Sequence, residues 1–166
     1  MKSICLIGFM GSGKTTLGKE LAKKLDAVFL DTDEEIIKWR EMDIPEIFQL
    51  EGEKRFREYE TEVLKGLPQK NTVIATGGGI IEAKMNRDIL KNDFFTVYLK
   101  TSFEEIKQRL ASNKNRPLWN QEMEKKEQLY DSRQYIYEEC ADQIIQTDDY
   151  SAERIVQMIM KSIVQQ

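Results

Sequence analysis

The sequence predicts an α/β protein in which a five-stranded parallel sheet carries helices on both faces. Its 166 residues, 40% of them hydrophobic, are enough to build one core. Short β-rich runs alternate with amphipathic stretches of helical periodicity, a pattern typical of parallel sheets. No internal repeat, low-complexity tract or Pro/Ser-rich linker interrupts this alternation. We therefore expect residues 1–166 to form a single domain.

Five apolar runs are predicted to form the strands, and we expect each of them to be buried. They span residues 3–7, 28–30, 72–75, 95–99 and 143–146. In sheets of this kind, ligands bind beyond the C-terminal ends of the strands. The functional residues are therefore expected just after these runs.

Apolar stripes at helical spacing predict three of the helices. The middle stripe includes one polar position. The stripes are Leu17, Leu21 and Leu25, then Phe56, Glu60, Val63 and Leu67, and finally Ile155, Val156, Ile159, Met160 and Ile163.

The segment of residues 112–122 departs from the alternation of strands and helices. It is polar, contains Pro117, and joins a helix to a helix. A mobile lid that closes over a ligand has this character, and so does an ordinary surface loop. Both interpretations stay open at this point.

The composition excludes several classes of function. The chain has no histidine, which removes histidine general bases, histidine metal sites and Ser-His triads. Cys5 and Cys140 lie far apart without metal-ligand spacing, so we expect reduced thiols. The net charge of −4 argues against non-specific nucleic-acid binding. No apolar run approaches the roughly 20 residues of a membrane span, and the N-terminal one is too short for a signal peptide. We expect a cytoplasmic protein that binds neither membrane nor nucleic acid.

Residues 8–15 fit the phosphate-binding pattern G-x-x-x-x-G-K-[ST], between the first predicted strand and the first predicted helix. Glycines let the backbone curl so that successive N–H groups point at phosphate oxygens, and the helix N-terminus adds its positive dipole end. In this arrangement Lys14 reaches the β- and γ-phosphates and the Thr15 hydroxyl coordinates Mg²⁺. The pattern predicts a nucleotide-binding loop, the P-loop.

Two classes of P-loop enzyme are compared: a nucleotide-dependent switch or ATPase, and a small-molecule kinase. No Asp has Gly three residues later, and the stretch from Asn113 to Arg116 ends in Arg where a guanine-reading motif needs Asp. A GTPase switch is therefore excluded. A P-loop module without enzymatic activity is the alternative of a different class.

Asp31 and Asp33 follow the second predicted strand. Residues two apart in an extended segment project to the same side, so both carboxylates are expected to face the P-loop. Asp31 could hold Mg²⁺ through water, and Asp33 could accept a hydrogen bond from an attacking hydroxyl. The competing interpretation is a capping box of Thr32 and Glu35 that starts a helix.

Arginines and glycines supply the remaining candidate site residues. Arg57 offers a planar fork for a carboxylate, beside Phe48 and Phe56, which could wall a small ring. Thr76 and three glycines, residues 77–79, directly follow the third strand, which predicts a ligand-facing loop. Arg133 could form a second fork, and Arg116 could offset charge that develops during transfer. Singly, each arginine is more often in a surface ion pair, but together they favour an anionic acceptor plus ATP.

These motifs together resemble shikimate kinase over nearly the whole chain. The matching stretches are GFMGSGKTT, DTDEEI, IPEIFQLEGEKRFREYE, ATGGG, NRPLW and R-x-x-x-Y-x-x-x-AD. The resemblance implies the P-loop NTPase fold of nucleoside monophosphate kinases, with a substrate-binding region around residues 33–60 and a lid around residues 112–122. The chain departs from the family pattern at Trp119 and Tyr135.

The resemblance also implies a reaction and a cytoplasmic, monomeric enzyme: ATP would phosphorylate the 3-hydroxyl of shikimate in the pathway to chorismate and aromatic amino acids. Its catalytic residues would be Lys14, Asp33 and Arg116, and its Mg²⁺ contacts Thr15 and, through water, Asp31. ATP would be bound by Gly11, Ser12, Gly13, Lys14, Thr15, Thr16, Arg109 and Arg116. Shikimate would be bound by Asp33, Arg57, Gly78, Gly79 and Arg133. A P-loop kinase for another small hydroxylated acid is the alternative, although a gluconate kinase would need a histidine-containing motif.

Overall fold

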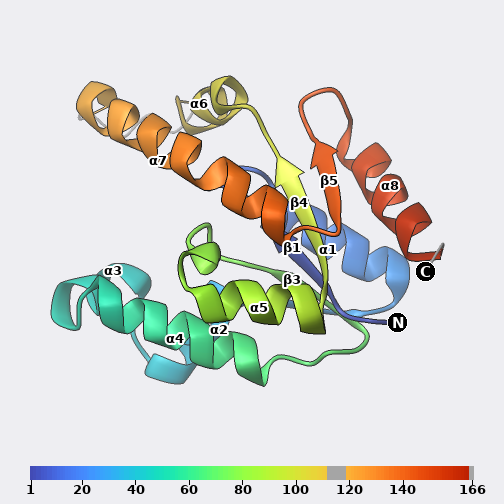
Figure 1. The fold of residues 1–166 in the computed structure, drawn as a ribbon, viewed down its shortest axis with the longest axis horizontal. Coiled ribbons are helices and arrows are strands. Elements are labelled where there is room, and N and C mark those ends of the chain that lie inside the picture. Colours follow the sequence, from blue (N-terminus) through green and yellow to red (C-terminus); the bar gives the residue numbers. More distant parts are fainter. Residues whose placement is uncertain (112–118, 165–166) are drawn as a thin grey trace.

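The computed structural model describes residues 1–111 and 119–164. Within them, five parallel strands form one sheet in the order β2-β3-β1-β4-β5, as Figure 1 shows. The strands are β1 (Ile4–Ile7), β2 (Val28–Asp31), β3 (Thr72–Ala75), β4 (Phe95–Lys100) and β5 (Gln143–Gln146). The predicted fold class is confirmed.

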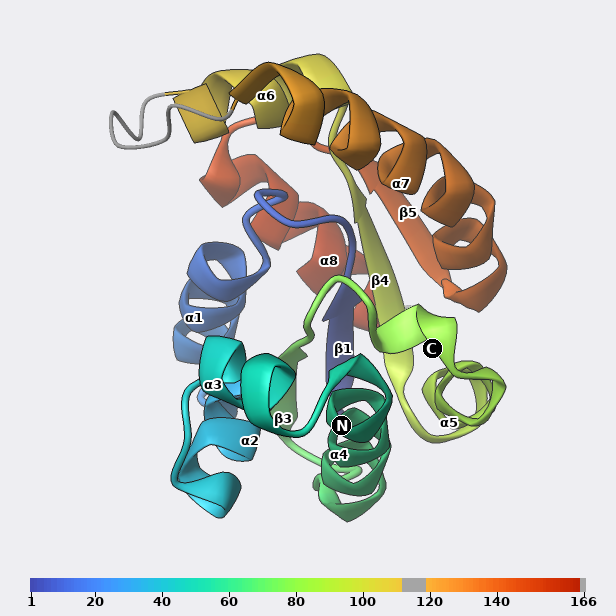
Figure 2. The same ribbon diagram turned by 90° about the vertical axis from the view of Figure 1, so that its left-hand side faces the viewer.

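Helices connect the strands and cover both faces of the sheet, as the views in Figures 1 and 2 show. They are α1 (Lys14–Leu25), α2 (Thr32–Arg40), α3 (Ile44–Leu50), α4 (Glu53–Gly66), the short 3-10 helix η1 (Ile80–Glu82), α5 (Lys84–Asp93), α6 (Phe103–Ala111), α7 (Trp119–Cys140) and α8 (Ala152–Val164). None of the helices in the described part of the chain is long and apolar enough to cross a membrane.

The two faces of the sheet carry separate hydrophobic cores. Side chains alternate along a strand, so Cys5 and Ile7 of β1 point into the core formed with α4, α5 and α7. Ile4 and Leu6 point into the core formed with α1 and α8. The predicted helical stripes supply much of both cores. Cys5 and Cys140 are buried and carry unpaired thiols, as expected.

The prediction that all five strands are buried is wrong for two of them. β2 and β5 form the edges of the sheet, where less of each face is covered by helices. Val28 of β2 is 59% exposed and Ile144 of β5 is 48% exposed. The three central strands are almost entirely buried, as predicted.

A third, smaller core joins α2, α3 and α4, which lie together in Figure 2. It is built from Ile36, Ile47, Phe56 and Tyr59. Asp43 caps α3 by accepting a hydrogen bond from the backbone N–H of Glu46 at 2.8 Å. These three helices carry the predicted substrate-binding region of residues 33–60 on the β2 and β3 side of the sheet.

The start of α2 differs from two predictions: that Thr32 caps the helix, and that Asp33 lies in an extended segment. Asp31, not Thr32, is the N-cap residue, because its Oδ1 accepts the backbone N–H of Asp33 at 3.0 Å. Thr32 is buried, and its hydroxyl accepts the backbone N–H of Gly77 at 3.1 Å. Asp33 therefore lies in the first turn of the helix and not in an extended segment.

We expect Leu21→Ala to destabilise the fold by about 2–5 kcal/mol, because a cavity would replace a fully buried side chain. Urea unfolding monitored by circular dichroism measures this loss. Leu50→Ala is the matched control: Leu50 is 68% exposed, and its truncation should change the stability by less than about 0.5 kcal/mol. Equal losses in the two variants would contradict the assignment of the core.

Candidate functional site

The loop between β1 and α1 has a backbone that requires glycine. Gly8 has φ +150° and Gly13 has φ +90°. A Cβ atom at position 8 would lie 2.7 Å from the backbone oxygen of Leu99 in β4. Glycine thus lets the loop pass close to β4 before α1 begins at Lys14. The N-terminus of α1, with its unpaired N–H groups, then faces the loop.

Lys14 is buried under this loop. Its ammonium group donates hydrogen bonds to the backbone oxygens of Gly8 at 2.7 Å and Phe9 at 2.9 Å, and to the hydroxyl of Ser12 at 3.3 Å. Burial lowers the pKa of Lys14 to about 8, although the charges of Asp33 and Asp31 oppose this shift. A phosphate oxygen is a stronger acceptor for such a cation than a carbonyl group is. Lys14 is therefore suited to bind an anion at the mouth of the loop.

Thr15 and Asp31 lie together beside the P-loop. The Thr15 hydroxyl donates to Asp31 Oδ2 at 3.0 Å. The described residues contain no group of three acidic, histidine or cysteine side chains that could hold a metal on its own. Mg²⁺ commonly uses one or two protein oxygens together with water and nucleotide phosphates. The oxygen pair of Thr15 and Asp31 fits this kind of site.

A cavity of about 460 Å³ lies on one side of the P-loop. Arg109 borders it, and its Nη1 donates to the backbone oxygen of Gly11 at 2.8 Å. The lining residues come from the P-loop, α1, α6, the loop after β5 and the start of α8: Gly11, Ser12, Gly13, Thr16, Leu17, Arg109, Leu110, Thr147, Tyr150, Ala152 and Ile155. With its phosphate loop and apolar walls, this cavity suits a nucleotide.

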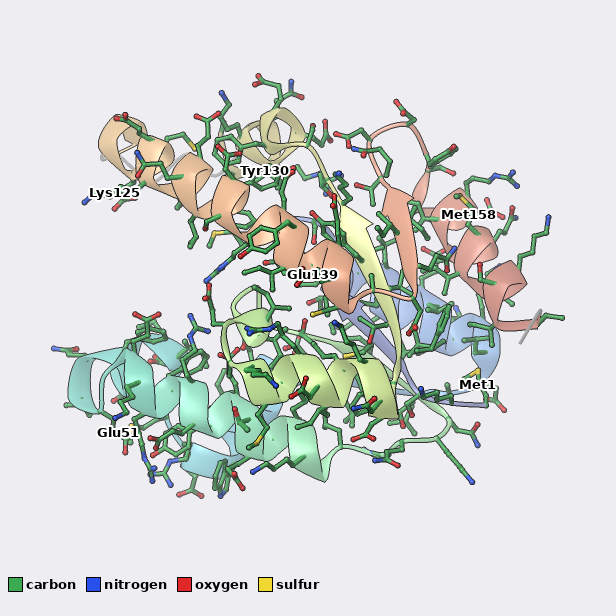
Figure 3. All side chains as sticks on the ribbon, in the orientation of Figure 1. Met1, Glu51, Lys125, Tyr130, Glu139 and Met158 are labelled. Carbon is green, nitrogen blue, oxygen red and sulfur yellow. The ribbon has the colours of Figure 1, made fainter. Side chains whose placement is uncertain are left out.

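Thr147, Tyr150 and Ala152 also line this cavity, and none of them was predicted from the sequence. Thr147 directly follows β5, so the rule that ligands bind after strand ends points to it. The Thr147 hydroxyl is hydrogen bonded to that of Thr101 at 2.6 Å, and Tyr130 of α7, labelled in Figure 3, donates to the backbone oxygen of Thr101 at 2.7 Å. These contacts join α7 to the wall of the nucleotide cavity.

A second cavity, of about 440 Å³, lies on the other side of the P-loop. We call it the acceptor cavity. It is lined by residues from the P-loop, α2, α3, α4, the loop after β3, η1 and α7: Met10, Asp33, Ile44, Glu53, Phe56, Arg57, Glu60, Gly77, Gly78, Gly79, Glu82, Leu129 and Arg133. The structure thus brings together Asp33, Arg57, the three glycines and Arg133, which the sequence scatters over about 100 positions.

Two carboxylates in the acceptor cavity are only partly satisfied. Asp33 Oδ1 and Glu60 Oε2 are buried without a hydrogen-bond partner in the protein. Burial raises the pKa of Asp33, with Asp31 adding to the shift, and burial also raises the pKa of Glu60 against the opposing effect of Arg57. Buried acceptors of this kind need donors. Ligand hydroxyl groups would supply them.

The glycine loop lies close to these acidic and basic groups. A Cβ atom at position 77 would lie 2.9 Å from Asp33 Oδ1, and one at position 79 would overlap the Arg57 guanidinium. Tyr137 of α7 donates its hydroxyl proton to the backbone oxygen of Gly78. Thr32 on one side and Tyr137 on the other therefore hold the loop in place.

The two arginines of the acceptor cavity are each paired with acidic residues. Arg57 donates to Glu60, which is completely buried, and to the exposed Glu53 at 3.2 Å. Arg133 is buried and donates from Nε to Glu82 at 2.7 Å. The roles of Glu60, which was predicted as part of a helical stripe, and of Glu82 were not predicted from the sequence. A glutamate close to an arginine on one helix is too common to single out Glu60, and Glu82 lies 51 residues from Arg133 in the sequence.

Arg116, Phe48 and Tyr135 were also singled out from the sequence, and none of them is among the described residues that line the two cavities. Arg116 and most of the predicted lid, residues 112–118, lie outside the described residues. The predicted lid ran to residue 122, but α7 already begins at Trp119. Phe48 packs against Phe56 with a ring separation of 4.8 Å but does not line the acceptor cavity, whereas Phe56 does. Tyr135 is exposed on α7 and lies in neither cavity.

Comparison with known proteins points to one family. The family model for shikimate kinase matches residues 10–164. The shikimate kinase of Burkholderia lata is 42% identical over 97% of this chain and 89% of its own length. That of Enterococcus faecalis is 41% identical over 98% of this chain and 99% of its own. The solved structure of the Acinetobacter baumannii shikimate kinase in complex with shikimate superposes with a TM-score of 0.89 and 42% identity, covering 99% of this chain and 94% of that chain.

We expect nucleotide affinity to fall as the pH rises above the Lys14 pKa of about 8. Only the protonated amine attracts phosphate, and bound phosphates stabilise that form, so binding must take up a proton at higher pH. Between about pH 7.5 and pH 9 the affinity for MgATP should drop roughly tenfold. Isothermal titration measures it, with Lys14→Met as the control that should bind weakly at every pH. A flat profile for the unsubstituted protein would contradict the buried, titrating Lys14.

Proposed function

The chain belongs to the shikimate kinase family, and we propose that it transfers the γ-phosphoryl group of MgATP to the 3-hydroxyl of shikimate. Family membership makes it a phosphotransferase of this class. The observation that carries the choice of acceptor is the composition of the acceptor cavity. It combines two guanidinium groups with two buried carboxylate oxygens that need donors. A small acid that also carries hydroxyl groups matches both features.

We propose that the shikimate carboxylate binds Arg57 and Arg133. Guanidinium groups bind carboxylates through paired, charge-assisted hydrogen bonds. Both arginines line the acceptor cavity beside Gly78 and Gly79, where the absence of side chains leaves room for the ring. The complex of the Acinetobacter baumannii enzyme with shikimate supports this choice of ligand.

Asp33 is proposed to accept the hydrogen bond of the attacking hydroxyl group. Its unpartnered Oδ1 lies in the acceptor cavity, and the charge of Asp33 acts on the neighbouring Lys14. Phosphoryl transfer passes through a loose transition state, so the main task is alignment and the neutralisation of charge. A carboxylate with a raised pKa can orient the hydroxyl and then take its proton.

Lys14 and the loop N–H groups are proposed to hold the transferred phosphoryl group. Lys14 would exchange its bonds to the loop carbonyls for bonds to the β- and γ-phosphates. Thr15 would bind Mg²⁺ directly and Asp31 would bind it through water, and the ion would neutralise phosphate charge. Gly11, Ser12, Gly13 and Thr16 would bind the phosphates, with Arg109 beside the base.

The proposed roles of Arg116 and the lid rest on the family resemblance alone, because residue 116 lies outside the described residues. We propose a monomer that works in the cytoplasm.

The direct test of this function is ADP release with MgATP and shikimate, run beside gluconate, AMP and no acceptor. We expect strong stimulation by shikimate alone. If shikimate gave no stimulation while MgATP still bound, the acceptor would be another small hydroxylated acid. The arginine pair favours an acid over a neutral sugar in either case.

We expect Asp33→Asn to lower kcat about 100-fold or more while MgATP binding and the fold are retained. The amide keeps the shape of the side chain but cannot take a proton, and it binds a hydroxyl donor less strongly. Steady-state kinetics and circular dichroism check both parts. Asp88→Asn, an exposed residue paired with Lys84 on α5, is the control and should be unchanged. A near-normal kcat in Asp33→Asn would remove Asp33 from the mechanism.

Gly79→Ala should raise the shikimate KM about tenfold or more, because the new methyl group displaces the Arg57 guanidinium from the cavity. The KM for ATP should not change. Gly66→Ala in α4 is the matched control, since no atom lies within 4 Å of the added methyl group. If Gly79→Ala bound shikimate normally, the position proposed for Arg57 would be wrong.

A further inference from the structure

Arg133 reaches the acceptor cavity in an orientation that another side chain holds. It extends from α7 and is only 6% exposed. Its Nε donates to Glu82 Oε1 at 2.7 Å, and Glu82 closes the short helix η1, 51 residues earlier in the chain. On its other side, Nη1 lies 3.7 Å from the position that a Cβ atom would take at Gly78. The ion pair with Glu82 therefore sets the orientation of the guanidinium plane, and Gly78, which has no side chain, leaves room for its Nη1 end.

The choice of Nε as the donor to Glu82 has a consequence for the terminal nitrogens. A guanidinium group carries five N–H donors in one plane, one of them on Nε and four on the two terminal nitrogens. A bond at Nε sets the rotation of this plane and leaves the terminal donors for other acceptors. The Tyr137 hydroxyl interacts with this guanidinium group, and the remaining terminal donors can bind a second carboxylate. Arg133 and Glu82 both line the acceptor cavity, so these donors lie at its wall.

Glu82 also carries a negative charge, which would repel an acidic ligand. This repulsion would weaken ligand binding, whereas the orientation of Arg133 by Glu82 would strengthen it. The Glu82 side chain is 40% exposed, so solvent screens its charge at the distance of the ligand. The direct bond to a buried guanidinium is much less screened, and a buried arginine without a partner loses its orientation. The positioning effect is therefore the larger one.

We propose that Glu82 is a positioning residue for the acceptor: it orients Arg133 so that the terminal nitrogens of Arg133 bind the ligand carboxylate. The inference rests on the proposed function, because it assumes that the acceptor is an acid bound by Arg133. Tight binding of the acceptor then requires a side-chain oxygen at position 82 that accepts the hydrogen bond from Arg133 Nε.

The test uses Glu82→Ala and Glu82→Gln in the full-length protein, with kcat and KM measured for both shikimate and ATP. Glu82→Ala should raise the shikimate KM about 5- to 20-fold, and it should leave the ATP KM and kcat within about twofold. Glu82→Gln keeps an oxygen acceptor for Nε and should remain within about threefold of the unsubstituted protein. Glu62→Ala, an exposed glutamate paired with Lys65 on α4, is the control and should have no effect.

A second substrate separates positioning from a general loss of structure. An analogue with a hydroxymethyl group in place of the shikimate carboxylate cannot use the Arg133 fork. Its KM should therefore be the same in the unsubstituted protein and in Glu82→Ala. Equal increases for both substrates would overturn the proposal, as would a lower shikimate KM in Glu82→Ala, which would mean that charge repulsion dominates.

Thermal unfolding would show whether Glu82→Ala fails to fold. In that case, the shikimate KM of Glu82→Gln would test the proposal. If this variant loses shikimate affinity as severely as Arg133→Ala does, the role of an oxygen acceptor is refuted. Failure of the proposed function has a different result: the unsubstituted protein itself would not phosphorylate shikimate.

Discussion

The parallel register of β1, β2 and β3 is the constraint on which the site depends. Leu6 of β1 and Asp31 of β2 both pair with Ala75 of β3. Since all three strands run in the same direction, the chain leaves them at one edge, where the P-loop, the start of α2 and the glycine loop meet. Lys14, Asp33 and Gly77 come from these three segments. The hydrogen bonds of Thr15 with Asp31 and of Thr32 with Gly77 join the same segments, and they depend on this register. A shift in register would therefore separate the groups of the two cavities.

Charges that are costly to bury are concentrated along this edge. Lys14 donates to loop carbonyls, Arg57 is paired with the buried Glu60, and Arg133 is paired with Glu82. Buried ion pairs contribute little to stability, since desolvation offsets their attraction. Their value here is orientation: each cation is held by protein oxygens in a position from which it can bind an anionic ligand. The site is thus organised before ligands arrive.

Much of this could be predicted from the sequence because short motifs report local backbone geometry. The strand, glycine loop and helix around Lys14 follow from their spacing, as does the glycine loop after β3. The position of Asp33 was predicted for the wrong reason: Asp31 caps α2, and the helix rather than an extended strand directs Asp33 into the cavity. The partner of Arg133 was not predictable, because Glu82 and Arg133 meet only through the packing of α7 on η1. The exposure of β2 and β5 likewise depends on strand order, which local patterns do not determine.

The most direct test of this account is a crystal structure of the protein with shikimate and MgADP. The shikimate carboxylate should lie between Arg57 and Arg133, with one hydroxyl group within hydrogen-bond distance of Asp33. The ADP phosphates should lie against the N–H groups of the P-loop and the ammonium group of Lys14, on the side of the P-loop that faces away from shikimate. A carboxylate bound elsewhere, or hydroxyl groups turned away from Asp33, would contradict the assignment of the two cavities.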